Sequence, residues 1–246
     1  MSDESTPTEP AQGAGHPAPP SDAPVFNRAD WPDQPGYDAL AQVYAQTFPD
    51  AYTTPLERHV IEAFAQSVRA RTGHPLVVDV GAGIGHVSAH LEELGCRVIA
   101  VEPSAEMRRH AQHSHPGLDL RDGDASLTNV DLSGVDGILA RFSLIHSAPT
   151  DVAAVLRQWH RRLPGGAIIV LACQSSDSPG VHPFDHAVAP AWRWHPDTLA
   201  DALADASFTE QWRTISRPND GHHRFPELHM LATAETHTET SPADIG

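Results

Sequence analysis

The chain has 246 residues, and its 16 Lys and Arg against 32 Asp and Glu give a formal net charge of −16 at pH 7. Such an acidic chain lacks the clustered cations that bind phosphate backbones or anionic lipid surfaces, so neither nucleic acid nor membrane is an expected partner. No apolar run approaches the roughly 20 residues of a membrane span, and the start of the chain lacks the pattern of a signal peptide, so we expect a cytoplasmic protein.

Both ends of the chain are polar. Residues 1–34 are rich in Pro, Ser, Gly and acidic side chains, and residues 235–246 are similarly polar. Segments of this composition bury too little apolar surface to offset the entropy of ordering, so we predict two disordered tails around one folded domain, residues 35–234. Cys96 and Cys173 each lie beside an apolar run, which favours buried reduced thiols over a disulfide.

The domain opens with apolar side chains at helical spacing, which predict helices over 40–48 and 60–68. The β-branched run 75–80 ends in glycines and predicts a buried parallel strand. A helix over 87–94 and a strand over 98–101 complete a βαβ unit.

The alternation continues through the rest of the domain. Ser104 is placed to cap the next helix. Further strands are predicted at 118–122, 135–140, 167–172, 208–215 and 225–234, and helices at 152–163 and 197–205. A loop with Pro and His residues is expected between 173 and 196. The alternation predicts a doubly wound α/β fold.

Three glycines, Gly81, Gly83 and Gly85, lie directly after the first strand and before a helix. Glycine tolerates positive φ, and its bare backbone lets a ligand approach a helix N-terminus. The turn therefore predicts a nucleotide-like ligand, with a purely structural turn as the alternative. A dinucleotide fingerprint starting at Gly81 needs a third glycine at position 86, where the chain has His86.

Two carboxylates follow the next strands. Glu102 ends the second strand, about 20 residues after the first glycine, where a carboxylate can accept hydrogen bonds from both ribose hydroxyls. Asp124 follows the third strand and could accept the exocyclic amine of an adenine, with an ordinary Asp-Gly turn as the alternative. The joint spacing of the glycines and Glu102 favours ligand binding over a solvated strand end.

Four motifs in this order, Asp79–Gly85, Glu102, Gly123–Ala125 and Leu163–Gly166, resemble those of the class I S-adenosylmethionine-dependent methyltransferases. The resemblance covers nearly all of 37–234. It implies a Rossmann-like, mostly parallel seven-stranded sheet whose last strand is antiparallel. It also implies a methyltransferase with S-adenosylmethionine as cofactor, and opening helices that cover the substrate.

Within the family, Ala140–His146 looks like the motif after strand four of small-molecule methyltransferases, and Arg224–Thr233 is similar to bacterial members. The chain has neither the Pro-Pro-aromatic segment of amide and DNA methyltransferases nor the acidic pair of magnesium-dependent catechol enzymes. The resemblance thus implies metal-independent transfer to oxygen or nitrogen of a small metabolite. The implied cofactor contacts are Asp79, Gly81, Ala82, Gly83, Gly85, Glu102, Pro103, Met107, Asp124, Ala125, Arg141 and Phe142.

His146, just past the fourth strand, is the candidate general base, because an imidazole can accept a proton near neutral pH. A hydrogen-bonded wall residue is the alternative. Tyr37 and Tyr44 either close over the cofactor or simply pack. An NAD(P)-dependent oxidoreductase and a non-catalytic cofactor-binding protein remain alternatives, the latter including a metal version built on His222, His223 and His229. The sequence assigns no oligomeric state.

Overall fold

The computed structural model describes residues 36–217 and 224–236. Its main sheet is formed by the strands β1 (Leu76–Val80), β2 (Arg97–Glu102), β3 (Asp119–Asp122), β4 (Gly137–Arg141), β5 (Ile168–Gln174), β8 (Phe208–Ser216) and β9 (Glu227–Ala234). They lie in the order β3-β2-β1-β4-β5-β9-β8. The first five strands pair in parallel, and β9 is antiparallel to both β5 and β8. The predicted Rossmann-like α/β fold with an antiparallel last strand is confirmed.

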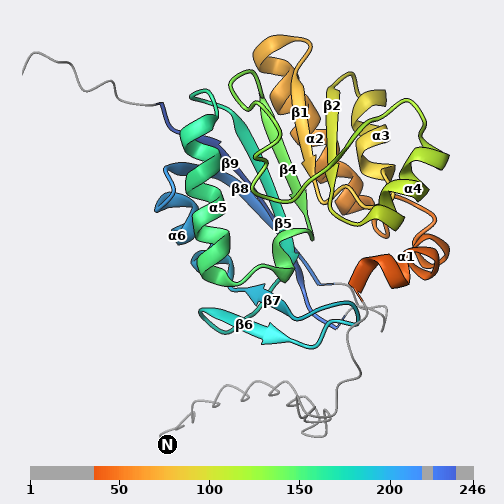
Figure 1. Cartoon of the computed structure of the whole chain (residues 1–246). Helices are drawn as coiled ribbons and strands as arrows, with labels where there is room; N and C mark the ends of the chain where they lie inside the picture. Colours follow the sequence, from red (N-terminus) through yellow and green to blue (C-terminus); the bar gives the residue numbers. More distant parts are fainter. Residues whose placement is uncertain (1–35, 218–223, 237–246) are drawn as a thin grey trace, which may run out of the picture. The chain divides into compact units, whose positions relative to one another are not determined.

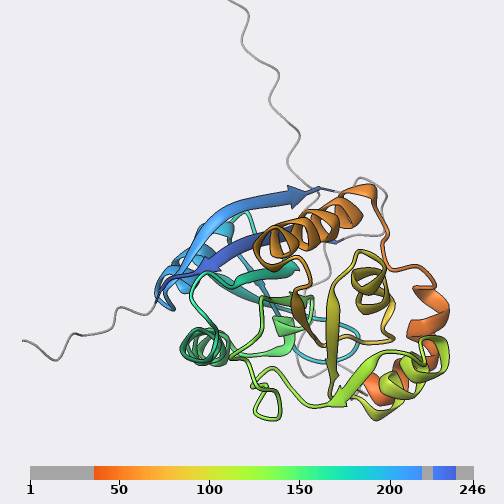
Figure 2. The same ribbon diagram turned by 90° about the horizontal axis from the view of Figure 1, so that it is seen from above.

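The helices lie on both faces of this sheet (Figures 1 and 2). They are α1 (Gly36–Thr47), α2 (Pro55–Thr72), α3 (His86–Glu93), α4 (Ala105–Ser114), α5 (Pro149–Arg162) and α6 (Pro196–Ala204), with a 3-10 turn η2 (Leu144–His146) after β4. All predicted strands and helices are present, and Ser104 caps α4 by accepting a hydrogen bond from the backbone N–H of Met107.

Helix α2 shows why these elements form and pack. Thr54 and Glu57 make a reciprocal capping box at its start, which satisfies backbone N–H groups that have no partner within the helix. Its apolar stripe includes Phe64 and Val68, which are fully buried against the sheet. Each such side chain contributes about 1.5–3 kcal/mol of hydrophobic stabilisation. A Cβ on Gly137 of β4 would lie 2.8 Å from Val68 Cγ1, so glycine there permits the close contact.

The segment after β5 differs from the prediction. In place of an irregular loop it forms an antiparallel hairpin of β6 (Val181–Phe184) and β7 (Ala191–Trp194). Trp194 is buried in the core beside β5, which anchors the hairpin. Figure 1 shows the hairpin and α1 at the same end of the main sheet. The prediction failed because Pro and His interrupt the alternation that would otherwise indicate strands.

The predicted tails, 1–34 and 235–246, lie outside the described residues except for Glu235 and Thr236. The backbone N–H of Glu235 donates to Ser207 O at 2.9 Å. Both cysteines are free and buried, as predicted. Within 36–217 and 224–236, no helix has both the length and the apolar composition needed to cross a membrane.

Candidate functional site

The glycine turn lies at the carboxyl end of β1, and its three glycines have φ of 70° (Gly81), 57° (Gly83) and 82° (Gly85). The backbone N–H of Gly81 donates to Val101 O at 2.8 Å, which joins the turn to β2. A Cβ on Gly81 would lie 2.3 Å from Ser143 Cβ, and one on Gly85 would lie 2.9 Å from Leu118 Cδ1. Packing therefore requires glycine at Gly81, whereas at Gly85 the end of the Leu118 side chain would have to shift. At Gly83 a Cβ would meet nothing within 4 Å, so open space borders the middle of the turn.

Glu102 ends β2 directly beside this turn and is only 5% exposed. Its Oε2 accepts a hydrogen bond from Gly83 N at 2.8 Å, and its Oε1 accepts one from Ser104 N at 2.8 Å. Burial raises the pKa of Glu102, although these two hydrogen bonds act in the opposite direction. The two residues whose spacing suggested a nucleoside site are thus in contact. Each carboxylate oxygen keeps a further lone pair for a ligand hydroxyl.

Asp79 lies below the turn, in β1, and is 3% exposed. Its Oδ2 accepts a hydrogen bond of 2.6 Å from the Ser88 hydroxyl of α3. Burial raises the pKa of Asp79 to about 6, while the hydrogen bond from Ser88 and the positive charge of Arg141 act against this shift. The carboxylate therefore joins the strand to the helix on either side of the glycine turn.

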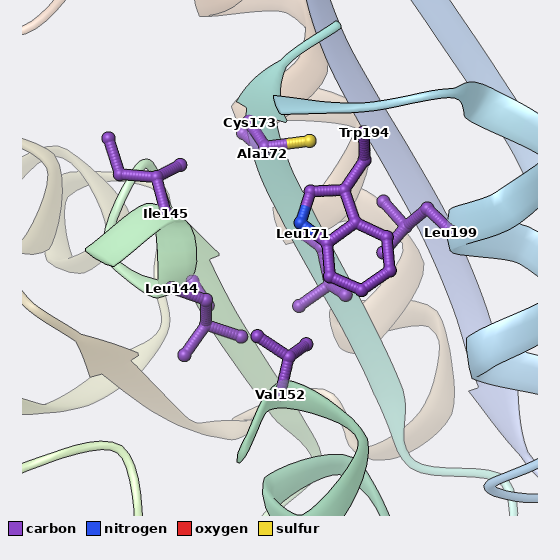
Figure 3. Close-up of a pocket in the computed structure, with 9 residues that line it drawn as sticks. Leu144, Ile145, Val152, Leu171, Ala172, Cys173, Trp194 and Leu199 are labelled. Atoms are coloured by element: carbon purple, nitrogen blue, oxygen red, sulfur yellow. The ribbon is translucent and has the colours of Figure 1, made fainter. Parts of the chain in front are cut away.

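A cavity of about 70 Å³ lies between the glycine turn and α1. Its walls include Asp79 and Arg141 from the sheet, Gly81–Gly83 from the turn, Tyr44 from α1 and Phe48, which directly follows α1. A second, apolar cavity of about 20 Å³ lies on the other face, among the side chains drawn in Figure 3. The second cavity has room for about one water and contains no charged side chain, so it belongs to the core.

Helix α1 covers the first cavity and is joined to α4. Asp38 Oδ1 accepts hydrogen bonds from Ser104 Oγ at 2.6 Å and from Glu106 N at 3.1 Å. The hydrogen bond from Ser104 lowers the pKa of Asp38. Met107, predicted to contact the cofactor, is buried under α1 with Ala41. Pro103 is exposed at the edge of this group.

His146 is joined to α1 and to the hairpin. Its Nδ1 lies 3.0 Å from Pro190 O, which can only accept, so Nδ1 carries the proton and donates. Its Nε2 then accepts from the hydroxyl of Tyr37 at 3.0 Å. Burial lowers the pKa of His146 below its usual range, so the ring is neutral. Both nitrogens are engaged, as expected of a wall residue, and the general-base role stays a prediction.

Asp124 turns toward its own backbone. Its Oδ1 accepts hydrogen bonds from the backbone N–H and the hydroxyl of Ser126, which lower its pKa. The carbonyl of Ala125 accepts a hydrogen bond of 2.8 Å from Trp159 Nε1, which fixes this turn on α5. The geometry matches the Asp-turn alternative, and contact of Asp124 and Ala125 with an adenine stays a prediction.

Arg141 ends β4 and forms an ion pair with Glu57 of α2. Burial would raise the pKa of Glu57, but hydrogen bonds from Thr53 and the charge of Arg141 lower it overall. The Arg141 guanidinium also lies over the ring of Phe142, 5.0 Å from its centroid. Sequence reasoning missed Glu57, because the Thr54-x-x-Glu57 pattern indicates only a helix start.

Comparison with known proteins finds similarity over part of the chain. Residues 77–166 match the family described as a methyltransferase domain. The chain is 30% identical over 92 residues to an uncharacterized methyltransferase of Alkaliphilus oremlandii, covering 35% of this chain and 42% of that protein. It is 35% identical over 97 residues to a ubiquinone/menaquinone biosynthesis C-methyltransferase of Rubrivivax gelatinosus, covering 39% and 38%. The chain thus spans about two fifths of the length of these relatives.

Solved structures share the fold over a longer span. One is the Burkholderia thailandensis 1,6-didemethyltoxoflavin-N1-methyltransferase with bound 1,6-didemethyltoxoflavin and S-adenosylhomocysteine. Its TM-score is 0.59 at 24% identity, covering 88% of this chain and 94% of that one. Another is the magnesium protoporphyrin IX methyltransferase of Synechocystis with bound S-adenosylmethionine, with a TM-score of 0.60 at 13% identity, covering 81% and 93%.

Proposed function

We propose that this chain, which carries a class I S-adenosylmethionine-dependent methyltransferase domain, transfers a methyl group to oxygen or nitrogen of a small metabolite without a metal ion. We assign the domain to residues 35–234. The observation that carries the proposal is the contact between Gly83 N–H and the Glu102 carboxylate beside open space. This contact adjoins the point where the strand order reverses between β1 and β4, and α/β sheets bind ligands at such points.

The residues present fit an adenosyl ligand. Gly83 leaves room where any other side chain would project, and its main chain can approach a ligand closely. Glu102 has lone pairs for the two hydroxyls of a ribose, and the buried, flexible Met107 suits the face of a flat base. The bound S-adenosylmethionine would supply an electrophilic methyl group on its sulfonium.

The protein's contribution is then to position the acceptor and to exclude water. Correct placement of two reactants can supply about 7–11 kcal/mol of the barrier. Tyr44 of α1 and Phe48, which directly follows α1, cover the cavity and would keep competing water away from the reacting atoms. If the acceptor replaces the Tyr37 hydroxyl, the neutral His146 offers the lone pair of Nε2 to the proton that leaves the acceptor.

Calorimetry with S-adenosylhomocysteine tests the cofactor assignment. We expect the wild type to bind one equivalent, and Glu102→Ala to bind at least roughly tenfold more weakly, a loss of about 1.4 kcal/mol. Glu106→Ala is the matched control, because Glu106 lies four residues further on and pairs with Arg109. Absence of wild-type binding, or tight binding of NADH in its place, would overturn the proposal.

A transfer assay tests the chemistry. The protein is incubated with candidate metabolites and S-adenosylmethionine that carries a deuterated methyl group, and mass spectrometry detects the labelled product. We expect one labelled methyl group on oxygen or nitrogen, and the same rate with and without a chelator. Label on carbon, or activity that a chelator abolishes and magnesium restores, would contradict this part of the proposal.

A further inference from the structure

A row of residues crosses four neighbouring strands near the carboxyl end of β4, and all but one of its side chains are polar. Arg141 of β4 is opposite Ala172 of β5, which is opposite His229 of β9, which is opposite Thr214 of β8. Residues directly opposite each other in a sheet point to the same face. These residues therefore share one face of the sheet. Gln174 lies two residues beyond Ala172 and shares that face.

The face is the one that α2 covers. The next row on this face, two residues before Arg141 on β4, consists of Leu139, Val170 and Leu231. These side chains pack in the apolar cluster that contains the buried side chains of α2. Figure 2 shows α2 and α5 on opposite sides of the sheet. The side chains thus change from apolar to polar along this face, toward the first turn of α2, where Glu57 pairs with Arg141.

The row buries polar atoms that have no hydrogen-bond partner among the described residues. They are both ring nitrogens of His229, Arg141 Nε, Gln174 Oε1 and Thr214 Oγ1. His229 is 1% exposed. Buried polar groups in proteins are nearly always hydrogen-bonded, because an unpaired one keeps the full cost of leaving water. The missing hydrogen bonds must come from buried water or from a bound ligand.

The charges of the row limit the chemistry of that partner. The positive charge of Arg141 is balanced by Glu57, and Gln174 and Thr214 are uncharged. Burial lowers the pKa of His229 to about 4, with a further contribution from Arg141, so its ring is neutral. A neutral imidazole offers one donor and one acceptor. Glu227, opposite Gln174, has an interaction of its own and is not part of this set.

The row begins at the proposed cofactor cavity. Arg141 lines that cavity together with Gly81 and Gly83. Phe142, the next residue, has φ of 55°, which is unfavourable for a bulky side chain. Its ring lies edge-on to His229, with centroids 5.8 Å apart. Strained residues of this kind concentrate at ligand sites. The row, with Phe142 beside it, therefore begins at the cofactor cavity and runs across the face of the sheet that α2 covers.

We propose that His229, Thr214 and Gln174 form the subsite for the methyl acceptor, and that they recognise an uncharged ring carrying a hydrogen-bond donor beside an acceptor, as in a cyclic amide. This inference rests on the proposed function, because it takes the adjoining cavity to hold the cofactor. It places acceptor recognition on β5, β8 and β9. His146, which contacts Tyr37 of α1 and Pro190 of the hairpin loop, would then be a wall residue and not the general base.

Nuclear magnetic resonance tests the subsite on the full chain saturated with S-adenosylhomocysteine. The ring signals of His229 are assigned by their loss in His229→Phe, and 2-pyridone, benzoate and benzylamine are titrated as uncharged, anionic and cationic probes. We expect a saturable shift with 2-pyridone alone. Thr214→Val should weaken it at least tenfold, whereas Thr209→Val, an exposed position on the same strand, should not.

Two results would contradict the proposed subsite and leave the proposed function intact. In the first, S-adenosylhomocysteine binds but 2-pyridone shifts no His229 signal. In the second, a charged probe gives a larger shift than 2-pyridone. A crystal structure that shows only water against His229 would do the same. His229→Phe separates binding from folding, because removing an unpaired buried imidazole should not lower the melting temperature. If it unfolds the protein, His229 is a structural residue and the proposal fails.

Discussion

At the scale of single residues, the turn needs glycine at positions 81 and 83 for different reasons. Both have positive φ, but a Cβ on Gly83 meets nothing while one on Gly81 overlaps Ser143. We expect Gly83→Ala to cost about 1–2 kcal/mol of folding free energy, the price of a left-handed conformation, and to reduce binding of S-adenosylhomocysteine strongly. Gly81→Ala should be clearly less stable. Urea denaturation and calorimetry on both variants check this, and full affinity in Gly83→Ala would contradict it.

Asp79 gives a prediction about pH. Its pKa in the folded protein, about 6 because of burial, lies above the unfolded value of about 3.9. The cost of burying its charge is therefore absent below about pH 4 and complete above about pH 6. Asp79→Asn should be more stable than the wild type at about pH 8, by up to roughly 3 kcal/mol, and the difference should shrink as the pH falls toward 4.

Urea denaturation at several pH values measures this difference, with Asp119→Asn, at an exposed ion pair with Arg121, as the control. A difference that stays constant with pH would show that the Asp79 carboxyl has the same pKa in the folded and unfolded states.

The sequence predicted some residue contacts and not others. Gly83 and Glu102 lie at the ends of neighbouring parallel strands, so their spacing alone indicated proximity. The pairs Tyr37–His146 and Glu57–Arg141 join residues 109 and 84 positions apart, across irregular segments. Contacts of this kind depend on how α1 and α2 pack on the sheet, and no local pattern records them.

At the scale of elements, α1 is joined to the rest of the protein by few polar contacts. Asp38→Ala removes the acceptor for both Ser104 Oγ and Glu106 N. We expect amide hydrogens of α1 to exchange clearly faster in this variant, with little change in the melting temperature, because the core clusters do not involve Asp38. Gln42→Ala, at an exposed position of the same helix, is the control. Unchanged exchange in α1 would contradict the role given to Asp38.

Helix α5 supports the turn after β3. Trp159→Phe keeps most of the buried ring but removes the hydrogen bond from Nε1 to Ala125 O. We expect a loss of about 1 kcal/mol in the free energy of unfolding and a smaller loss of affinity for S-adenosylhomocysteine. Trp192→Phe on the hairpin serves as control. If Trp159→Phe binds as tightly as the wild type, the turn at 124–126 does not depend on α5 for its ligand geometry.

Elements whose apolar side chains recur at clear helical or strand spacing were predicted well. Helices with long apolar stripes and β-branched strands buried on both faces appear as expected. The hairpin β6–β7 was missed, because its four-residue strands contain Pro183 and carry half-buried side chains on both faces. Short strands of this kind depend on a partner, here the buried Trp194, more than on their own sequence.

At the scale of the whole molecule, the glycine turn, Glu102 and the cover formed by α1 meet at one end of a Rossmann-like sheet. The fold followed from the order of the motifs, and the same motifs predicted the cofactor. The polar row that we propose as the acceptor subsite did not follow from the motifs, because it is built from β5, β8 and β9 and becomes visible only when the register between these strands is known.

A crystal structure of the protein with S-adenosylhomocysteine tests the central claim most directly. We predict the adenosyl group beside Gly83, with both ribose hydroxyls donating to the Glu102 carboxylate and the base against Met107. A ligand bound elsewhere, or a complex in which Glu102 does not contact the ribose, would contradict the account.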